Sequence, residues 1–201
     1  MEEKVDRRIH KTRKAIKKTF IELLNEKHFG DIGVNDIAER ADINRGTFYL
    51  HYQDKFDLFE KYVDELLNEL VAKIKASNQE KDQTKNGIED NDSSTYVLFF
   101  KHFQAYSSFF KPMLSFKGGP YFYTRFIEII KDFYSQQYNK LLDEEKQNLD
   151  QEILINFAAH AHLGVVSNWL QEGMTKTPEY MGEQLSILLS SLLKVYSEEK
   201  E

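Results

Sequence analysis

The chain has 201 residues, a net charge of −6, 41% hydrophobic residues and 13% aromatic residues, a composition typical of a globular chain and not of a disordered one. It contains no cysteine, which excludes disulfides and thiolate metal or redox sites. It also lacks an N-terminal signal-like apolar stretch and any apolar run near the length of a bilayer span. We therefore expect a soluble, cytoplasmic protein that does not enter a membrane.

The N-terminal segment carries positive charge that the acidic total conceals. Between Lys4 and Lys18, eight residues are basic and only Asp6 is acidic. Up to Phe56 the chain has 12 basic and 10 acidic residues, whereas the remainder has 15 and 23. Because phosphate attraction is screened over about 10 Å, a distant acidic part would have little influence on it. The basic run therefore indicates a nucleic-acid partner, with a solvated charged helix face as the alternative.

Residues 33–52 have the pattern of two short helices joined by a tight turn. Val34, Ile37, Ala38 and Ala41 follow the i, i+3, i+4, i+7 spacing of one helix face. Asp42 then interrupts the pattern, and aspartate tolerates the left-handed backbone of a sharp turn. This spacing is typical of a helix-turn-helix, although many helical hairpins share it.

The second helix of this pair is expected from about Arg45 to Tyr52, with Asn44 as its N-cap. Small residues in its first turn, Gly46 and Thr47, would let the backbone approach a phosphate. Phe48 and Tyr52 would pack inward, and the outward set is Arg45, Thr47, Tyr49 and His51. Exposed polar and aromatic side chains on a short helix favour insertion into the major groove of DNA.

The run from Lys11 to Leu58 resembles the N-terminal domain of TetR/AcrR-type transcriptional regulators. The matching positions are Thr12, Ala15, Ile16, Phe20, Leu23, Leu24, Phe29-Gly30, Val34 to Ala41, Arg45 to Tyr49, His51-Tyr52, Asp54-Lys55 and Leu58-Phe59. Gly33 departs from the family, which usually has a phosphate-contacting threonine there, and Asp42 stands where glycine is usual. Asp36 keeps the other half of the capping box.

The resemblance implies an all-α fold, with a three-helix helix-turn-helix domain at 1–54 joined by a long helix to an effector-binding and dimerisation domain at 55–201. It implies a homodimer on a palindromic double-stranded operator. The implied DNA-binding residues are Lys11, Gly33, Val34, Asn44, Arg45, Gly46, Thr47, Tyr49, His51, Tyr52 and Lys55. We expect base or groove contacts from Arg45, Thr47 and Tyr49, and phosphate contacts from Lys11, His51, Tyr52 and Lys55.

Helical patterns continue through the rest of the chain. A fourth helix is expected from Asp54, with Asp57 as its capping partner, and a polar, mobile loop at about 77–94. One aromatic-rich helical segment then runs from Tyr96 to Phe110, and a break at 117–120 precedes another helix. A helix at about 150–172 is ended by Gly173, and the last helix begins at Thr177-Pro178.

Two functions are expected of this half. A small-molecule effector pocket could involve Phe99, Phe103, Tyr106, Phe110, Phe122, Arg125, Phe126 and His160, although an aromatic stripe is more often core than ligand contact. A dimer interface could involve Trp169, Met181, Leu185, Leu188 and Leu192.

The most favoured function is a repressor released by an effector, with no cofactor or metal. His160 and His162 point roughly 200° apart on a helix and cannot share one metal ion. Nucleotide-loop, zinc-protease and nucleophile-elbow motifs do not occur. A regulator-like coactivator that works through a protein partner is the alternative, and a helical enzyme is a weaker one.

Overall fold

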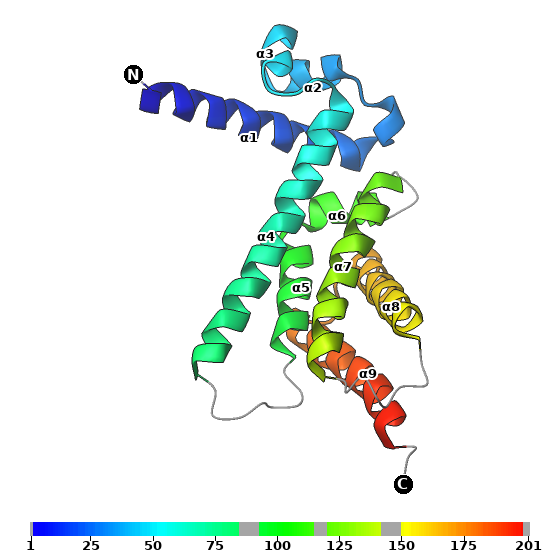
Figure 1. The fold of residues 1–201 in the computed structure, drawn as a ribbon. Helices are drawn as coiled ribbons and strands as arrows, with labels where there is room; N and C mark the ends of the chain where they lie inside the picture. The colour runs from blue at the N-terminus through cyan, green and yellow to red at the C-terminus, as the bar shows by residue number, and fades with distance from the viewer. Residues whose placement is uncertain (1, 85–92, 115–119, 142–149, 199–201) are drawn as a thin grey trace. The chain divides into compact units, whose positions relative to one another are not determined.

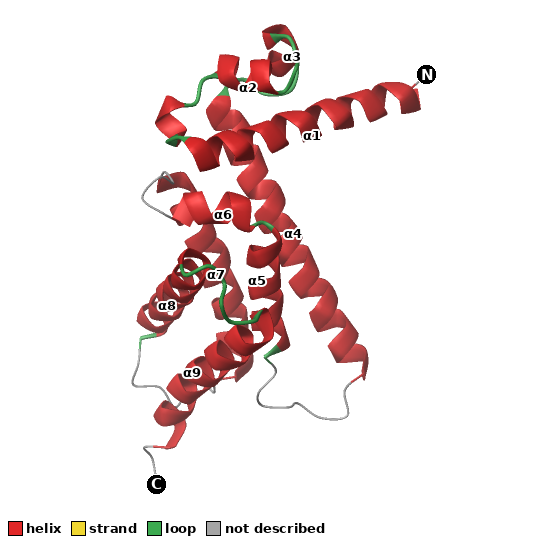
Figure 2. Ribbon diagram, turned by 180° about the vertical axis from the view of Figure 1, so that it is seen from behind, coloured by secondary structure: helices red, strands yellow, loops and turns green. Residues whose placement is uncertain are grey.

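The computed structural model describes residues 2–84, 93–114, 120–141 and 150–198, with side chains at 7–79, 93–114, 123–135 and 150–191. All regular structure in these ranges is helical, so the predicted all-α class is confirmed (Figures 1 and 2). The N-terminal helices are α1 (Glu2–Glu26), the 3₁₀ helix η1 (Phe29–Asp31), α2 (Val34–Arg40), α3 (Arg45–Tyr49) and α4 (Lys55–Thr84). The following helices are α5 (Ser94–Ala105), α6 (Ser107–Leu114), α7 (Pro120–Leu141), α8 (Gln151–Gln171) and α9 (Pro178–Glu198).

The chain forms two compact units, and α4 contributes to both. The first unit comprises Met1–Leu66 with Ser108–Phe122, and the second comprises Leu67–Ser107 with Tyr123–Glu201. The predicted limit of the DNA-binding domain, between residues 54 and 55, stays a prediction. Within the described ranges, none of the helices combines the length and apolarity that crossing a bilayer requires.

The first unit is built around the apolar faces of α1 and α4. Ile16, Phe20 and Leu24 of α1 are fully buried or nearly so, because their spacing places them on one side of the helix. The ring of Phe29 in η1 lies between them and α4, with centroids 6.1 Å from Phe20 and 5.2 Å from Phe59. Burial of aromatic rings of this size is the main stabilising contribution to such a core.

Helix α6 closes this core and contains a proline. Pro112 has no N–H to donate to the carbonyl of Ser108, four residues earlier. That carbonyl instead accepts a hydrogen bond from the Asn25 side chain of α1 at 2.8 Å. The proline therefore leaves a free acceptor, and a side chain from another helix of the same unit satisfies it.

In the second unit, α5 packs against both α8 and α9. Gly182 of α9 allows the close approach of α5, because a Cβ at this position would lie 2.5 Å from Val97 Cγ2 and 2.6 Å from Val97 N. Helix α8 is capped by Asp150, whose carboxylate accepts the N–H groups of Glu152 and Ile153. Its predicted end at Gly173 is confirmed, since Gly173 has a φ of +81° just after the helix.

Two expected boundaries differ from the structure. Helix α4 continues to Thr84, so 77–84 is helical and not loop, because polar residues such as Gln79, Glu80 and Lys81 propagate a helix that is already nucleated. The predicted loop residues 85–92 lie outside the described residues, and Ser94 at the predicted end of the loop already belongs to α5. The aromatic segment predicted as one helix is divided between α5 and α6 at Tyr106, where φ is −112° and ψ is 27°.

Candidate DNA-binding surface

The N-terminus of α2 is fixed by charge and backbone hydrogen bonding. The carboxylate of Asp36 accepts the Gly33 N–H at 2.8 Å and pairs with Lys27 Nζ at 2.7 Å. These two hydrogen bonds, that of Lys27 first, hold the pKa of Asp36 below its usual value. The predicted capping role of Asp36 is thus confirmed, and Gly33 and Val34 lie at the first turn of α2.

The turn between α2 and α3 has the geometry that the sequence predicts. Asp42 adopts a φ of 53°, in the left-handed region, and the Ile43 N–H returns to the Ala38 carbonyl at 3.0 Å. Asn44 caps α3, since its side-chain oxygen accepts the Gly46 N–H at 3.0 Å. Both local predictions are confirmed because each depends on neighbouring residues only.

Helix α3 is shorter than predicted and ends at Tyr49 instead of Tyr52. The His51 N–H bonds to the Phe48 carbonyl, three residues back, at 2.9 Å, which tightens the last turn. Phe48 is fully buried and Tyr52 is 4% exposed, whereas Tyr49 is 45% exposed. The burial pattern therefore gives α3 one inward and one outward face.

On the outward face, Arg45 is aligned along Tyr49. Its guanidinium donates to the Tyr49 hydroxyl at 3.0 and 3.3 Å, and its Cζ lies 5.5 Å from the centroid of the Tyr49 ring. Gly46 is also exposed, and Thr47 is half-buried. A pre-oriented guanidinium on an exposed helix is suited to bidentate contact with a guanine edge.

Two phosphate candidates have environments that favour other roles. Tyr52 packs its ring 5.7 Å from Phe48, and burial raises its pKa to about 12. The Lys55 ammonium donates to the carbonyls of Phe29 at 2.9 Å and Gly30 at 2.8 Å. Tyr52 therefore acts in packing, and Lys55 attaches η1 to the start of α4, because two of its three donors are directed at carbonyls.

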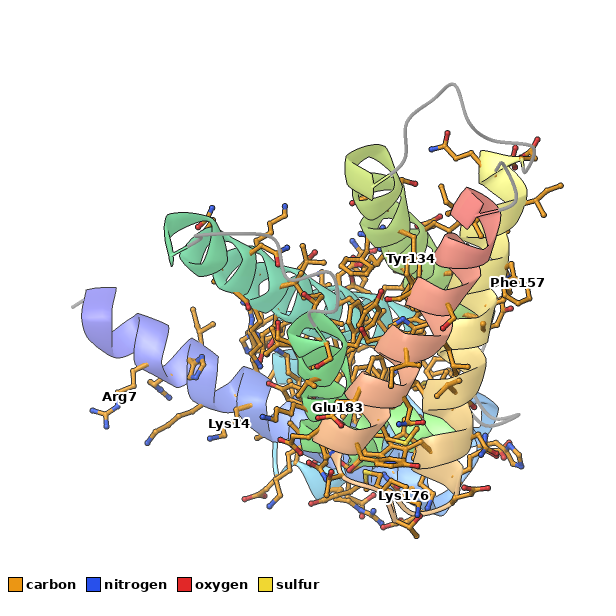
Figure 3. The ribbon with its side chains drawn as sticks, turned by 90° about the horizontal axis from the view of Figure 1, so that it is seen from below. Arg7, Lys14, Tyr134, Phe157, Lys176 and Glu183 are labelled. Carbon is orange, nitrogen blue, oxygen red and sulfur yellow. The ribbon has the colours of Figure 1, made fainter. Side chains whose placement is uncertain are left out.

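The other two phosphate candidates remain accessible. His51 is half-buried, and its pKa is lowered by burial and, secondarily, by the positive charge of Arg13. Lys11 is exposed and lies between Arg7 and Lys14 on one row of α1. Figure 3 shows Arg7 and Lys14 extending from the same side of this helix. This row is a basic stripe suited to a phosphate backbone.

The residues predicted for an effector pocket have different environments in the structure, and the pocket stays a prediction. Phe99, Phe103 and Phe126 are buried in the second unit, with 5.1 Å between the Phe103 and Phe126 centroids. Phe110 is buried in the first unit, and His160 is exposed, with Nδ1 2.7 Å from the Asn156 carbonyl.

The rest of that predicted set has polar partners or lies outside the description. The Tyr106 hydroxyl donates to Glu69 at 2.7 Å, and Arg125 pairs with Glu128 at 3.2 Å. The side chain of Phe122 is outside the described residues. Helical spacing alone could not separate these environments, because it gives the face of a helix but not the identity of the neighbour.

His162 is a buried polar residue that the sequence reasoning did not select. Its side chain is fully buried, with Nδ1 3.1 Å from the Tyr134 hydroxyl and the ring 4.6 Å from Phe99. Burial lowers its pKa to about 3, so the imidazole is neutral. Since His160 and His162 point in opposite directions, one of them had to face inward, and the apolar neighbours Ala159, Leu163 and Val166 were the available signal.

The predicted dimer residues also have mixed environments. Trp169 and Leu185 belong to the core of their own chain, and the Trp169 indole donates to the Lys176 carbonyl at 2.9 Å. Met181 is half-buried, Leu188 is 59% exposed, and the Leu192 side chain is outside the described residues. Among the described side chains of α8 and α9, the exposed large hydrophobic residues are Ile153, Phe157, Tyr180, Ile187 and Leu188.

Helices α2 and α3 are both capped and are joined by a tight turn, and they follow the basic helix α1 in the chain. Together with the outward face of α3, this arrangement defines a helix-turn-helix DNA-binding module. Residues 19–62 match the family of bacterial regulatory proteins called tetR, and residues 90–191 match a transcriptional regulator C-terminal region. The chain belongs to the TetR family of transcriptional regulators.

A curated relative is the uncharacterized HTH-type transcriptional regulator YxbF of Bacillus subtilis (strain 168). It is 23% identical over 188 residues, which cover 91% of this chain and 46% of that protein. The chain therefore spans about half the length of the curated relative it matches.

Solved structures share the fold over almost the whole chain. A TetR transcriptional regulator from Streptococcus agalactiae is 24% identical, with a TM-score of 0.68 and coverage of 94% of this chain and 99% of that one. NalD of Pseudomonas aeruginosa, a secondary repressor of the MexAB-OprM multidrug efflux pump, is 18% identical, with a TM-score of 0.63 and coverage of 90% and 96%. FadR from Bacillus subtilis, in complex with stearoyl-CoA, is 15% identical, with a TM-score of 0.62 and coverage of 88% and 97%.

Proposed function

We propose that this protein is a homodimeric repressor that occupies a palindromic operator and is released by a small-molecule effector. The observation that carries the DNA-binding part is the outward face of α3, on which the Arg45 guanidinium is held by the Tyr49 hydroxyl at 3.0 Å. In this proposal the face enters the major groove, where side chains read base edges. Lys11 and its neighbours on α1 contact the phosphate backbone.

The proposed dimer uses the outward apolar residues of α8 and α9. Phe157 on α8 is 55% exposed, and Figure 3 shows it directed away from the neighbouring helices. Leu188 on α9 is similarly exposed. Exposed apolar side chains on two helices of one unit would be buried against a second copy of the chain in the proposed dimer, because a two-fold interface is self-complementary.

The dimer is tested by charge insertion on this surface. Leu188→Glu and Phe157→Glu each place a charge in the proposed interface, so sedimentation should show monomers and palindrome affinity should fall. Ala76→Glu is the matched control, since Ala76 is an exposed residue of α4 in the same unit and outside the two helices of the proposed interface. Dimers that persist in both interface variants would place the interface elsewhere.

The effector part of the proposal depends on the second unit. A bound ligand weakens operator affinity only if it binds the DNA-free conformation more tightly than the DNA-bound one. NalD is a secondary repressor and FadR was solved in complex with stearoyl-CoA, so the two support a repressor and an effector role by analogy of fold alone.

The experiment is a titration of the purified chain against fragmented genomic DNA of its source organism at near-physiological salt, with the bound fragments sequenced. A short enriched palindrome is the expected result. Weak, salt-sensitive binding without sequence preference would contradict the proposal and favour the coactivator alternative, in which a protein partner supplies the specificity.

A further inference from the structure

Leu50 is an exposed apolar side chain at the C-terminal end of α3, which is the recognition helix in the proposed function. It is 81% exposed, more than any other large hydrophobic residue among the described side chains. A single exposed leucine is ordinary on a protein surface, so its exposure alone indicates nothing. Its position directly after Tyr49, at the C-cap of the helix that carries the DNA-binding proposal, is what distinguishes it.

The geometry of α3 places Leu50 at the centre of the outward face. Leu50 keeps helical backbone angles, with φ −71° and ψ −18°, and its N–H bonds to the Gly46 carbonyl at 3.3 Å. At about 100° per residue, the positions opposite the buried Phe48 are two before and two after it, namely Gly46 and Leu50. Since Gly46 has no side chain, Leu50 supplies the side chain at the centre of this face.

Gly46 also leaves room for close approach. A Cβ at Gly46 would have a single atom within 4 Å, the Asn44 side-chain oxygen at 3.7 Å, so the surface beside Leu50 is open. Arg45 and Tyr49 flank this opening and already contact one another. The arrangement is an apolar tip between polar side chains, directed away from the core.

Leucine cannot hydrogen-bond to a base edge or a phosphate, and covering such a group with it would cost the desolvation of that group. The thymine C5-methyl is the apolar surface that the major groove offers. We infer that Leu50 is a specificity-determining residue that packs against a thymine methyl group in each operator half-site. This inference rests on the proposed function and adds a base preference to it.

The test replaces single thymines of the enriched palindrome by deoxyuridine, symmetrically in both half-sites, which removes only the methyl group. For the wild-type chain, one position should lose about fourfold in affinity per half-site, the value of one buried methyl-sized group. Leu50→Ala should bind the thymine and uracil operators equally at that position. Its thermal stability should be unchanged, because Leu50 is not part of the core.

Thr47→Ser is the matched control, because Thr47 carries the other methyl group on α3 that could reach a thymine. The uracil effect should persist in this variant. The inference would be overturned if no uracil substitution changed the affinity of the wild-type chain. It would also be overturned if the uracil effect remained in Leu50→Ala and disappeared in Thr47→Ser. Either result would leave the proposed function intact. Failure to enrich any palindrome would overturn both.

Discussion

Lys11 and Lys55 of the first unit have different environments and therefore different roles. Lys11 is exposed on α1, whereas the ammonium of Lys55 is bound by two carbonyls of the η1 turn and lies 5.0 Å from the Phe29 ring centroid. The first lysine is available to a phosphate, and the second stabilises the connection between α1 and α2.

This difference gives opposite expectations for matched variants. Lys55→Met should lower the free energy of unfolding by about 1–3 kcal/mol, because two carbonyls lose a charged donor, and should leave the salt dependence of DNA binding unchanged. Lys11→Met should reduce the slope of log affinity against log salt by about one unit without changing stability. Chemical denaturation and salt titration measure the two effects. The reverse pattern would return Lys55 to the role of phosphate contact that its sequence position indicated.

Residues whose roles depend on near neighbours could be predicted from the sequence. Asp42 in the left-handed turn and Asn44 as N-cap are of this kind, since both depend on a few adjacent residues. Lys55 donates to carbonyls that lie 26 and 25 positions earlier in the chain, and no local sequence pattern specifies these contacts. Tyr52 fitted both an inward and a phosphate role, and only its burial decides between them.

At the scale of helices, the spacing of α5 and α9 is set by Gly182. Two of the three nearest atoms to a Cβ at this position are the Val97 backbone N and Cα, at 2.6 and 2.8 Å. Helical backbone cannot shift as a flexible side chain can, so any side chain here must separate the two helices.

Gly182→Ala should therefore destabilise the protein by roughly 1–3 kcal/mol, the usual cost of overpacking, despite the better helix propensity of alanine. The second variant, Val97→Ala in the Gly182→Ala background, should not restore stability, because the backbone contacts remain. Thermal unfolding measures both. Restoration of stability in the double variant would show that the Val97 side chain alone limits the packing.

The existence and order of helices followed from apolar periodicity, and their ends followed less well. The ends of α8 and the start of α9 had local signals in Asp150, Gly173 and Thr177-Pro178. The break between α5 and α6 falls at Tyr106, and this position has no glycine or proline that would have predicted it. The assignment of the aromatic residues to separate cores could not be predicted from the sequence either, because periodicity does not specify the residues against which a helix packs.

At the scale of the whole molecule, the buried neutral His162 links folding to pH. Its pKa is about 3 in the folded protein and 6.5 ordinarily, so the unfolded chain binds the additional proton between these values. The stability that neutral burial contributes is present above about pH 6.5 and is lost as pH falls. Described carboxylates such as Asp36 and Asp57 have lowered pKa values, so their contributions are lost at still lower pH.

Unfolding of the wild-type chain should therefore become easier by up to about 1.4 kcal/mol per pH unit between roughly pH 6 and 4.5. His162→Gln should be less stable at neutral pH but should show a shallower slope in this window. His160→Gln, two residues away and exposed, should keep the wild-type slope. Denaturant titrations across the pH range measure these slopes, and an unchanged slope in His162→Gln would assign the acid sensitivity to other groups.

The central claim is that the outward face of α3 reads the operator, and Arg45 tests it most directly. The measurement compares the wild-type chain and Arg45→Ala on every single-base variant of the enriched palindrome, at near-physiological salt. We predict a loss of about 1–3 kcal/mol with relaxed preference at one base pair in each half-site and an unchanged salt slope. Unaltered affinity and specificity in Arg45→Ala would contradict the assignment of α3 as the recognition helix.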